Sequence, residues 1–212
     1  MTADPTAPAA EHAPPAALPT QVDLRPHLDN TGITRPDDLG AGAFNVWSNT
    51  FPAQHLPPAR ADGTVDVGGV PFRFPAQAKG PDNLRCAGQR LDVPKGRYDW
   101  IYLLAAGERR TEDVLHLHFA DGTTDPEWLR VPDFWPQTPA HFGFTSGITF
   151  PVMHYPRHIQ RDMGPSLWRV RVPVPRETEL AGIRLPHNPA IHVFALTLSG
   201  TGTATRTGTE VA

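Results

Sequence analysis

Two histidines one residue apart, His116 and His118, have the types and spacing in this sequence that best suit chemistry. They lie in DVLHLHFADG (113–122), where they alternate with leucine and phenylalanine. A β-strand sends successive side chains to opposite faces, so we expect the apolar side chains in a core and both imidazoles on the other face. Parallel imidazoles could bind one transition-metal ion, or act as general acid and base near neutral pH. The alternative is that both rings lie on a solvated sheet face and bind nothing.

A second group of histidines occurs in MHYPRH (153–158). Its two histidines are four residues apart with a proline between them, which disfavours a helix and differs from the HExxH zinc signature. A third metal ligand could come from His141, His154, His158 or Asp133. Tyr155 could donate a proton or stabilise an oxyanion. We therefore predict catalytic roles for His116, His118, His154 and Tyr155, and ligand-binding roles for Arg157 and His158.

A strand-like run, LWRVRVPV (167–174), places Arg169 and Arg171 on one face and three apolar side chains on the other. One interpretation is a half-buried strand with a charged exterior. The other is a pair of guanidinium groups that bind a carboxylate or a polyhydroxylated ligand. If this strand lies beside residues 113–122 in one sheet, the arginines and histidines would line one concave surface.

Four aromatic residues, broken by proline and glycine, occur in VPDFWPQTPAHFGF (131–144). This pattern predicts a long irregular connection, and long connections in compact domains often carry function. Aromatic rings beside polar groups suit the flat faces of sugars or of polyketide-like molecules. We predict ligand-binding roles for Asp133, Trp135 and Phe142. The alternative is a connection that only caps the core with its own apolar side chains.

The elements that must position these residues are short strands. The chain has 25 prolines and 18 glycines, which nearly exclude long helices. Between these breakers lie eight or more short runs of alternating apolar and polar residues, and Asp121-Gly122 is a strong hairpin signal. We predict an all-β fold, an antiparallel two-sheet β-sandwich of the jelly-roll type with few or no helices. It forms one domain over 22–198, between an Ala/Pro-rich disordered tail (1–21) and a flexible C-terminal tail (199–212).

Five segments resemble the accessory β-sandwich domains of actinobacterial glycoside hydrolases, which are galactose-binding-like modules of the carbohydrate-binding type. They are VDLRPHLDNTGI, VGGVPFRFP, DNLRCAGQRLDVPKGRYDWIYLLAAG, LHFADGTT and LPHNPAIHVFALTL. The resemblance implies a jelly roll and sugar-like ligands, and it carries over no catalytic residues. Because 42–57 resembles the first long loop of such modules, Trp47, Asn45 and Asn49 are predicted to join the ligand pocket. The resemblance also raises the hypothesis of a structural Ca²⁺ near the oxygen-rich segment 23–38.

Composition narrows the classes of partner. The net charge is -3 and no block of Lys or Arg occurs, so we expect neither nucleic acid nor a membrane surface as partner. No apolar stretch is long enough to span a bilayer, and the N-terminus lacks the pattern of a secretory signal, so we expect a cytoplasmic protein. Cys86 is the single cysteine, which excludes an intramolecular disulfide. A homodimer is left open.

Two functional hypotheses follow. The first is a small intracellular enzyme on a carbohydrate-module-like jelly roll. It would act on a sugar-like or natural-product molecule through His-centred acid/base or metal-assisted chemistry, such as cyclisation, isomerisation or elimination. The second is a non-catalytic carbohydrate-binding protein. The histidines concentrated in one stretch favour the enzyme, and the resemblance favours the binding protein. The hypothetical cofactor is a divalent metal, either structural Ca²⁺ or a transition metal bound by His116 and His118.

Overall fold

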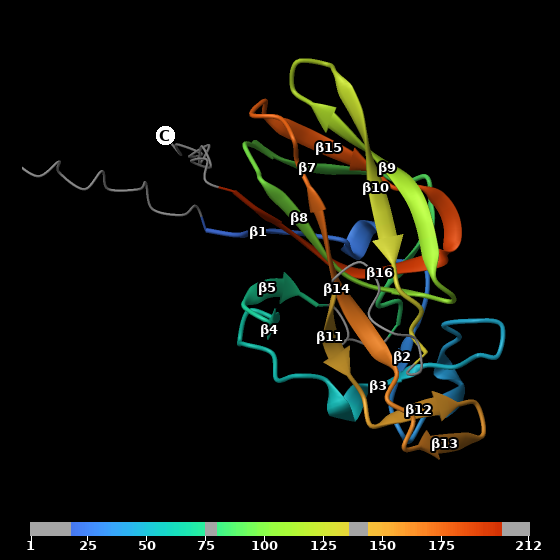
Figure 1. Ribbon diagram of the computed structural model, residues 1–212. Coiled ribbons are helices and arrows are strands. Elements are labelled where there is room, and N and C mark those ends of the chain that lie inside the picture. The colour runs from blue at the N-terminus through green and yellow to red at the C-terminus, as the bar shows by residue number, and fades with distance from the viewer. Residues whose placement is uncertain (1–17, 75–79, 136–143, 201–212) are drawn as a thin grey trace, which may run out of the picture.

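The computed structural model of the protein describes residues 18–74, 80–135 and 144–200, and nearly all of its regular structure is β-strand (Figure 1). Three 3-10 turns are the helical elements of the described residues: η1 (Arg25–His27), η2 (Leu39–Ala41) and η3 (Ala53–His55). The strands are β1 (Thr20–Val22), β2 (Ile33–Thr34), β3 (Phe51–Pro52), β4 (Thr64–Val67), β5 (Val70–Arg73), β6 (Leu84–Ala87), β7 (Arg90–Gly96), β8 (Trp100–Gly107), β9 (Thr111–Phe119), β10 (Thr124–Val131), β11 (Thr145–Thr149), β12 (Val152–Tyr155), β13 (His158–Arg161), β14 (Ser166–Pro173), β15 (Leu180–Arg184) and β16 (His187–Ser199). Most of the two predicted tails lies outside the described residues.

Two antiparallel sheets form the body of the protein. The six-stranded sheet has the order β1-β16-β8-β14-β11, with β6 also paired to β16. The four-stranded sheet has the order β10-β9-β15-β7 and covers one face of the larger sheet. This arrangement confirms the predicted all-β, antiparallel β-sandwich with few helices.

Strand β9 shows which face of the four-stranded sheet packs against the larger sheet. Leu115, Leu117 and Phe119 are almost completely buried in the core between the two sheets. His116 is exposed and His118 is half-buried on the opposite face. The strand therefore has the alternation expected from its sequence.

The six-stranded sheet has a second covered face. In β8, Ile101 and Leu103 pack in the core between the sheets, whereas Leu104 packs in a second core on the other face. The second core contains Phe51, whose ring contacts those of Phe44, Phe150 and Phe194. Its outer wall consists of the long loops and the small sheets β2-β3, β4-β5 and β12-β13, which Figure 1 shows below the main sandwich. The protein thus has a third layer that a simple two-sheet sandwich lacks.

None of the helical elements in the described part of the chain is long and apolar enough to cross a membrane. Cys86 is fully buried between the sheets, where burial raises the pKa of its thiol. This thiol is therefore a packing group rather than a nucleophile.

Candidate functional site

A hollow of about 370 Å³ opens where the third layer meets the end of the main sandwich. We call it the tryptophan hollow. Its lining residues are Trp47, Asn49, Glu108, Asp133, Phe134, Trp135 and Tyr155. Five of these seven, all except Glu108 and Phe134, are residues that the sequence suggested as catalytic or ligand-binding. The structure thus brings together residues from four separate segments of the chain.

A short backbone bridge places the two carboxylates of the hollow in neighbouring segments. Gly107 donates its N–H to Pro132 O (3.0 Å), and its carbonyl accepts the N–H of Phe134 (3.0 Å). A Cβ atom at Gly107 would lie 2.3 Å from Arg109 O, so only glycine fits here. The bridge joins the end of β8, followed by Glu108, to the segment that carries Asp133.

The loop that carries Trp47 is ordered by one asparagine. Asn45 Oδ1 accepts the N–H groups of Trp47 (3.1 Å) and Asn49 (3.2 Å). Thr50 then pairs with His154 of β12 through two backbone hydrogen bonds of 3.0 Å. The side-chain atoms Asn45 Nδ2 and Asn49 Oδ1 are buried and have no partner among the described residues. Such unsatisfied buried groups cost stability, and Asn49 is a lining residue of the hollow.

Three aromatic rings give the hollow its apolar surface. The exposed fractions of Trp47 and Trp135 are 65% and 37%, which is high for tryptophan. Tyr155 stacks on His158 with ring centroids 4.7 Å apart and planes at 11°. Phe134 meets the Trp135 ring edge-on at 5.9 Å and anchors it to the second core. Exposed rings held this way can bind the flat face of a small molecule.

Asp133 is the first of the two carboxylates. Its Oδ1 accepts the backbone N–H of Trp135 (2.9 Å), and its carbonyl accepts the indole N–H of Trp168 (2.9 Å). Burial raises the pKa of the Asp133 carboxyl, although the Trp135 N–H and the charge of Arg109 act in the opposite direction. Asp133 therefore combines a positioned backbone with a partly desolvated carboxyl.

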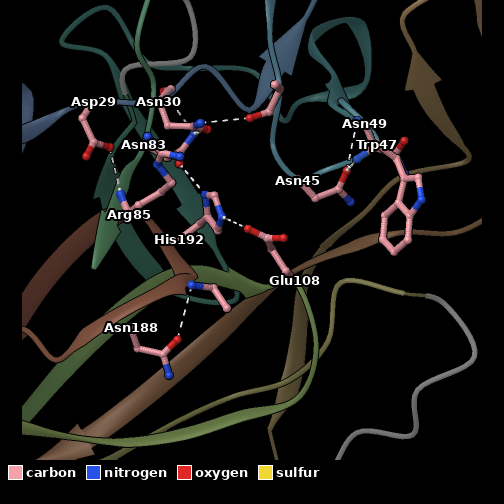
Figure 2. Close-up of polar contacts among 12 residues, drawn as sticks. Asp29, Asn30, Asn45, Trp47, Asn49, Asn83, Arg85, Glu108, Asn188 and His192 are labelled. Atoms are coloured by element: carbon pink, nitrogen blue, oxygen red, sulfur yellow. Dashed lines mark hydrogen bonds and ion pairs between the residues drawn. The ribbon is translucent and has the colours of Figure 1, made fainter. Parts of the chain in front are cut away.

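Glu108 is the second carboxylate, and it faces a buried imidazole. Figure 2 shows Glu108 between His192 and the loop that carries Trp47. Glu108 Oε1 lies 3.4 Å from His192 Nε2, and the exposed fractions of the two side chains are 26% and 0%. The ring of Phe44 covers the imidazole, with centroids 4.3 Å apart. Burial lowers the pKa of His192, while the hydrogen bond and charge of Glu108 raise it.

The other nitrogen of His192 determines where its proton lies. Nδ1 is 2.9 Å from Asn83 Oδ1. Asn83 Nδ2 donates to Asp82 Oδ1 (2.8 Å), which orients the amide with its oxygen toward His192. An amide oxygen only accepts, so Nδ1 carries the hydrogen and the neutral ring turns a lone pair toward Glu108. A hydrogen bond between Oε1 and Nε2 therefore needs one additional proton, held by the carboxyl or by the imidazole.

Asp82 completes this network from beneath. Its two oxygens accept the N–H groups of Gly32 (2.9 Å) and Ile33 (2.9 Å). Burial raises the pKa of Asp82 to about 6, and its three N–H partners counteract this. The chain of contacts Asp82–Asn83–His192–Glu108 thus runs from the interior to the hollow.

The histidines predicted to be catalytic do not meet in this structure. His116 and His118 lie in the four-stranded sheet, and His154 lies in the sheet β12-β13, at the opposite end of the molecule in Figure 1. His118 Nδ1 contacts Thr124 Oγ1 (3.0 Å), and burial followed by the charge of Arg90 lowers the pKa of the ring. None of the predicted ligand-binding residues lies beside it in β9, β10 or β15.

His154 is fully buried and held by the protein itself. Its Nδ1 lies 2.9 Å from Thr34 Oγ1, and its Nε2 lies 3.2 Å from Gln54 Nε2. Burial lowers the pKa of this imidazole. Both ring nitrogens are thus engaged in the structure, and the neighbouring Tyr155 faces the hollow instead.

The condition under which the arginines and histidines would line one surface, that their strands are neighbours in one sheet, is not met. Strand β14 lies between β8 and β11 in the six-stranded sheet, whereas β9 belongs to the other sheet. Arg169 and Arg171 do share one face, and Trp168, Val170 and Val172 are buried on the other, as the alternation predicts. The two arginines line a different hollow with Thr145 and Gly68.

The remaining predictions concern the end of β12 and the metal. His158 reaches the tryptophan hollow only through its stack on Tyr155, and Arg157 is an exposed turn residue. Phe142 and His141 lie outside the described residues. Within residues 18–74, 80–135 and 144–200, no three His, Cys, Asp or Glu side chains converge as metal ligands would. A metal at His116 and His118, or Ca²⁺ near segment 23–38, therefore stays a prediction.

Two residues of this candidate site, Glu108 and His192, were not predicted from the sequence. Glu108 follows an apolar strand as an ordinary charged turn residue, and His192 lies within the apolar run AIHVFALTL. The sequence signal that could have found His192 is a histidine inside an otherwise apolar run. An imidazole in a core needs polar partners on both nitrogens, so such a histidine indicates a buried polar contact.

The chain matches one family model, described as the AziU2-like beta-sandwich domain, over residues 18–201. No curated protein matches it. The match agrees with the sandwich seen here, and it does not extend to the carbohydrate-binding or galactose-binding-like assignment.

Proposed function

The chain belongs to the AziU2-like β-sandwich family, and from that premise we propose that it is an enzyme that binds a small molecule in the tryptophan hollow and moves a proton through Glu108. The substrate class is a sugar-like or natural-product molecule with one flat apolar face and polar groups. The reaction class is acid/base chemistry such as cyclisation, isomerisation or elimination. Glu108 and His192 take the role that the sequence suggested for His116 and His118.

The shape and lining of the hollow support a ligand of this class. Its volume of about 370 Å³ suits a molecule of one or two rings. Trp47, Trp135 and Tyr155 offer flat apolar surfaces, and Asn49, Asp133 and Glu108 offer polar groups beside them. Arrangements of few polar groups among aromatic rings are typical of small-molecule sites.

The contact between Glu108 and His192 carries the proposal of catalysis. When the pair lacks the additional proton, a carboxylate oxygen and an imidazole lone pair face each other at 3.4 Å. A proton placed between the two atoms would let one donate to the other, so the pair can accept one proton from a ligand. Once the proton lies between the two atoms, the same pair can return it, as a general acid/base group does.

Non-catalytic carbohydrate binding is the second candidate. The exposed indole rings of Trp47 and Trp135 favour it, because stacked aromatic rings are a common way to hold a sugar. In that case Glu108 would only accept hydrogen bonds from ligand hydroxyl groups. The two candidates share the hollow and differ in whether Glu108 accepts a proton.

The test uses 5-nitrobenzisoxazole, a flat probe whose ring opens when a base removes its C3 proton. The base gains the proton, the N–O bond breaks and a coloured nitrile phenolate forms, so no cofactor is needed. We expect the protein to accelerate this reaction beyond acetate at equal concentration, and Glu108→Gln to lower the rate about tenfold or more. Glu177→Gln, the same change at an exposed glutamate of a loop, should leave it unchanged.

Three outcomes decide the proposal. Loss of rate in Glu108→Gln but not in Glu177→Gln supports it. A rate that survives Glu108→Gln and disappears in Asp133→Asn refutes Glu108 as the base. No acceleration by the wild-type protein refutes the catalytic role and leaves the sugar-binding candidate. That candidate is then tested with methyl β-galactoside, which should shift the indole NMR signals of Trp47 and Trp135 and not that of Trp128, exposed on β10.

A further inference from the structure

A second hollow, of about 380 Å³, lies over the outer part of the six-stranded sheet. We call it the arginine hollow. Its lining residues are Gly68, Gly69, Val70, Tyr102, Phe144, Thr145, Arg169 and Arg171. It contains two cationic side chains and no acidic one. We propose that it is a binding site for a small molecule that carries a carboxylate or phosphate group.

Arg169 is held in place by neutral groups alone. Its Nη1 donates to the backbone carbonyls of Gly68 and Val67, and its Nη2 donates to Thr145 Oγ1 at 3.0 Å. These three bonds leave two of the five guanidinium N–H groups without a partner among the described residues. Carbonyl and hydroxyl acceptors orient the group without neutralising its charge, so the cation is ready for an anion.

The position of Arg169 requires a glycine at residue 68. The φ of Gly68 is +58°, and a Cβ atom there would lie 2.3 Å from Arg169 Nη1 and 3.0 Å from Arg169 Cζ. The missing side chain therefore makes the space that the guanidinium fills. Gly63, which does not line this hollow, also has a positive φ, +79°, but a Cβ atom there would have no neighbour within 4 Å.

Arg171 supplies the second positive charge. It is two residues along β14, so its side chain points to the same face as Arg169. Its guanidinium lies over the Trp100 ring, 4.7 Å from the centroid. The ion pairs found in the described part of the chain involve neither Arg169 nor Arg171.

The chemistry of the ligand follows from these contacts. Guanidinium groups bind carboxylate and phosphate oxygens in a planar, often bidentate geometry. Tyr102 and Phe144 line the same hollow, so they can contact an apolar body attached to the anionic group. A nucleic acid is disfavoured because the charge is confined to two residues and the chain carries a net charge of -3.

The experiment measures binding of benzoate and of phenyl phosphate to the whole protein by NMR titration, with benzyl alcohol as the neutral comparison. We expect at least one anion to bind, to shift the Nε–H signals of Arg169 and Arg171, and to bind better than benzyl alcohol. Arg171→Gln should weaken binding about tenfold or more, because a hydrogen bond to a charged group contributes at least about one tenfold step. Arg161→Gln removes the same charge from the exposed face of β13 and should not change binding.

The two glycines provide the sharpest comparison. Gly68→Ala should displace Arg169 and abolish anion binding. Gly63→Ala introduces a side chain at a similarly positive φ, outside the lining of the hollow and without touching the arginine, so it should keep binding. Binding of neither anion by the wild-type protein, or equal binding by Arg171→Gln, would overturn the proposal. Equal loss in both glycine variants would show that backbone strain, rather than Arg169, controls the site, and would overturn the proposal as well. Because Glu108 takes no part in this hollow, Glu108→Gln should bind the anions unchanged.

Discussion

Replacing Glu108 by Gln should make the imidazolium form of His192 harder to reach. In the wild-type protein, protonated Nε2 donates to a carboxylate 3.4 Å away, and Nδ1–H is already fixed by Asn83. In the variant, an amide of the same size faces Nε2, and its N–H can donate to the lone pair of the neutral ring. The substitution thus satisfies the neutral imidazole and removes the stabilisation of the charged one.

The size of the effect follows from the contact. A hydrogen bond to a charged group contributes about 1.5 to 3 kcal/mol. Glu108 is 26% exposed, so solvent screening favours the lower end of that range. Since 1.36 kcal/mol changes a protonation equilibrium tenfold, the imidazolium of His192 should become about tenfold less populated at a given acidic pH. The sign agrees with the raising influence of Glu108 on the pKa of His192.

The assay is a pH titration of the imidazole nitrogens by long-range ¹H–¹⁵N NMR, with Glu177→Gln as the control. The midpoint of His192 should move to lower pH in Glu108→Gln and stay in place in the control. At neutral pH the wild-type ring should show a protonated Nδ1. An unchanged or higher midpoint in Glu108→Gln, or a neutral ring protonated at Nε2, would refute the account of the proton between Glu108 and His192.

Three further predictions concern the scaffold of the site. Gly107→Ala should lower the free energy of unfolding by about 1 to 3 kcal/mol in urea titrations, because its Cβ would lie 2.3 Å from a carbonyl oxygen. The control Gly40→Ala should have little effect, because a Cβ atom there would have no neighbour within 4 Å. Phe51→Ala should cost about 3 to 5 kcal/mol by the same measurement, since its fully buried ring contacts four aromatic neighbours of the second core, and a cost below 1 kcal/mol would contradict that packing. The Asp82 carboxyl should titrate near pH 6 in ¹³C NMR of the folded protein, and a midpoint near the ordinary 3.8 would contradict its burial. The pKa of Asp82 is higher in the folded protein than its ordinary value of 3.8, so its contribution to stability is complete below pH 3.8 and is lost as the pH rises through 6. At 1.36 kcal/mol per pH unit, the loss amounts to about 3 kcal/mol.

Local patterns in the sequence were sufficient to predict the strands and their buried faces. The alternation in β9 and β14 determines which side chains enter the core, because pleating leaves no other choice. Strand β8 is apolar on both faces because the third layer covers the second face of its sheet. Pairing between distant strands has no comparable local signal. The sequence therefore could not decide whether β9 and β14 belong to one sheet.

The site was predictable only in part, for the same reason. The resemblance of 42–57 to a loop of carbohydrate-binding modules indicated Trp47 and Asn49, and the proline-broken aromatic segment indicated Asp133 and Trp135. Tyr155 was indicated by its place beside a histidine in MHYPRH. The pair of Glu108 and His192 joins the end of β8 to an internal position of β16, 84 residues apart in the chain. A single polar residue in an apolar run is informative only once its partner across the sheet is known.

The two halves of the tryptophan hollow differ in how firmly the fold holds them: one stands on sheet strands and the other on loops. His192 belongs to β16, which pairs with β1, β6 and β8, so opening that half requires several strands to separate together. Trp47 and Trp135 stand on loops that can be altered without touching those strands. Substitutions at Trp47 and Trp135 can therefore change the aromatic half of the hollow while the half that holds Glu108 and His192 keeps its structure.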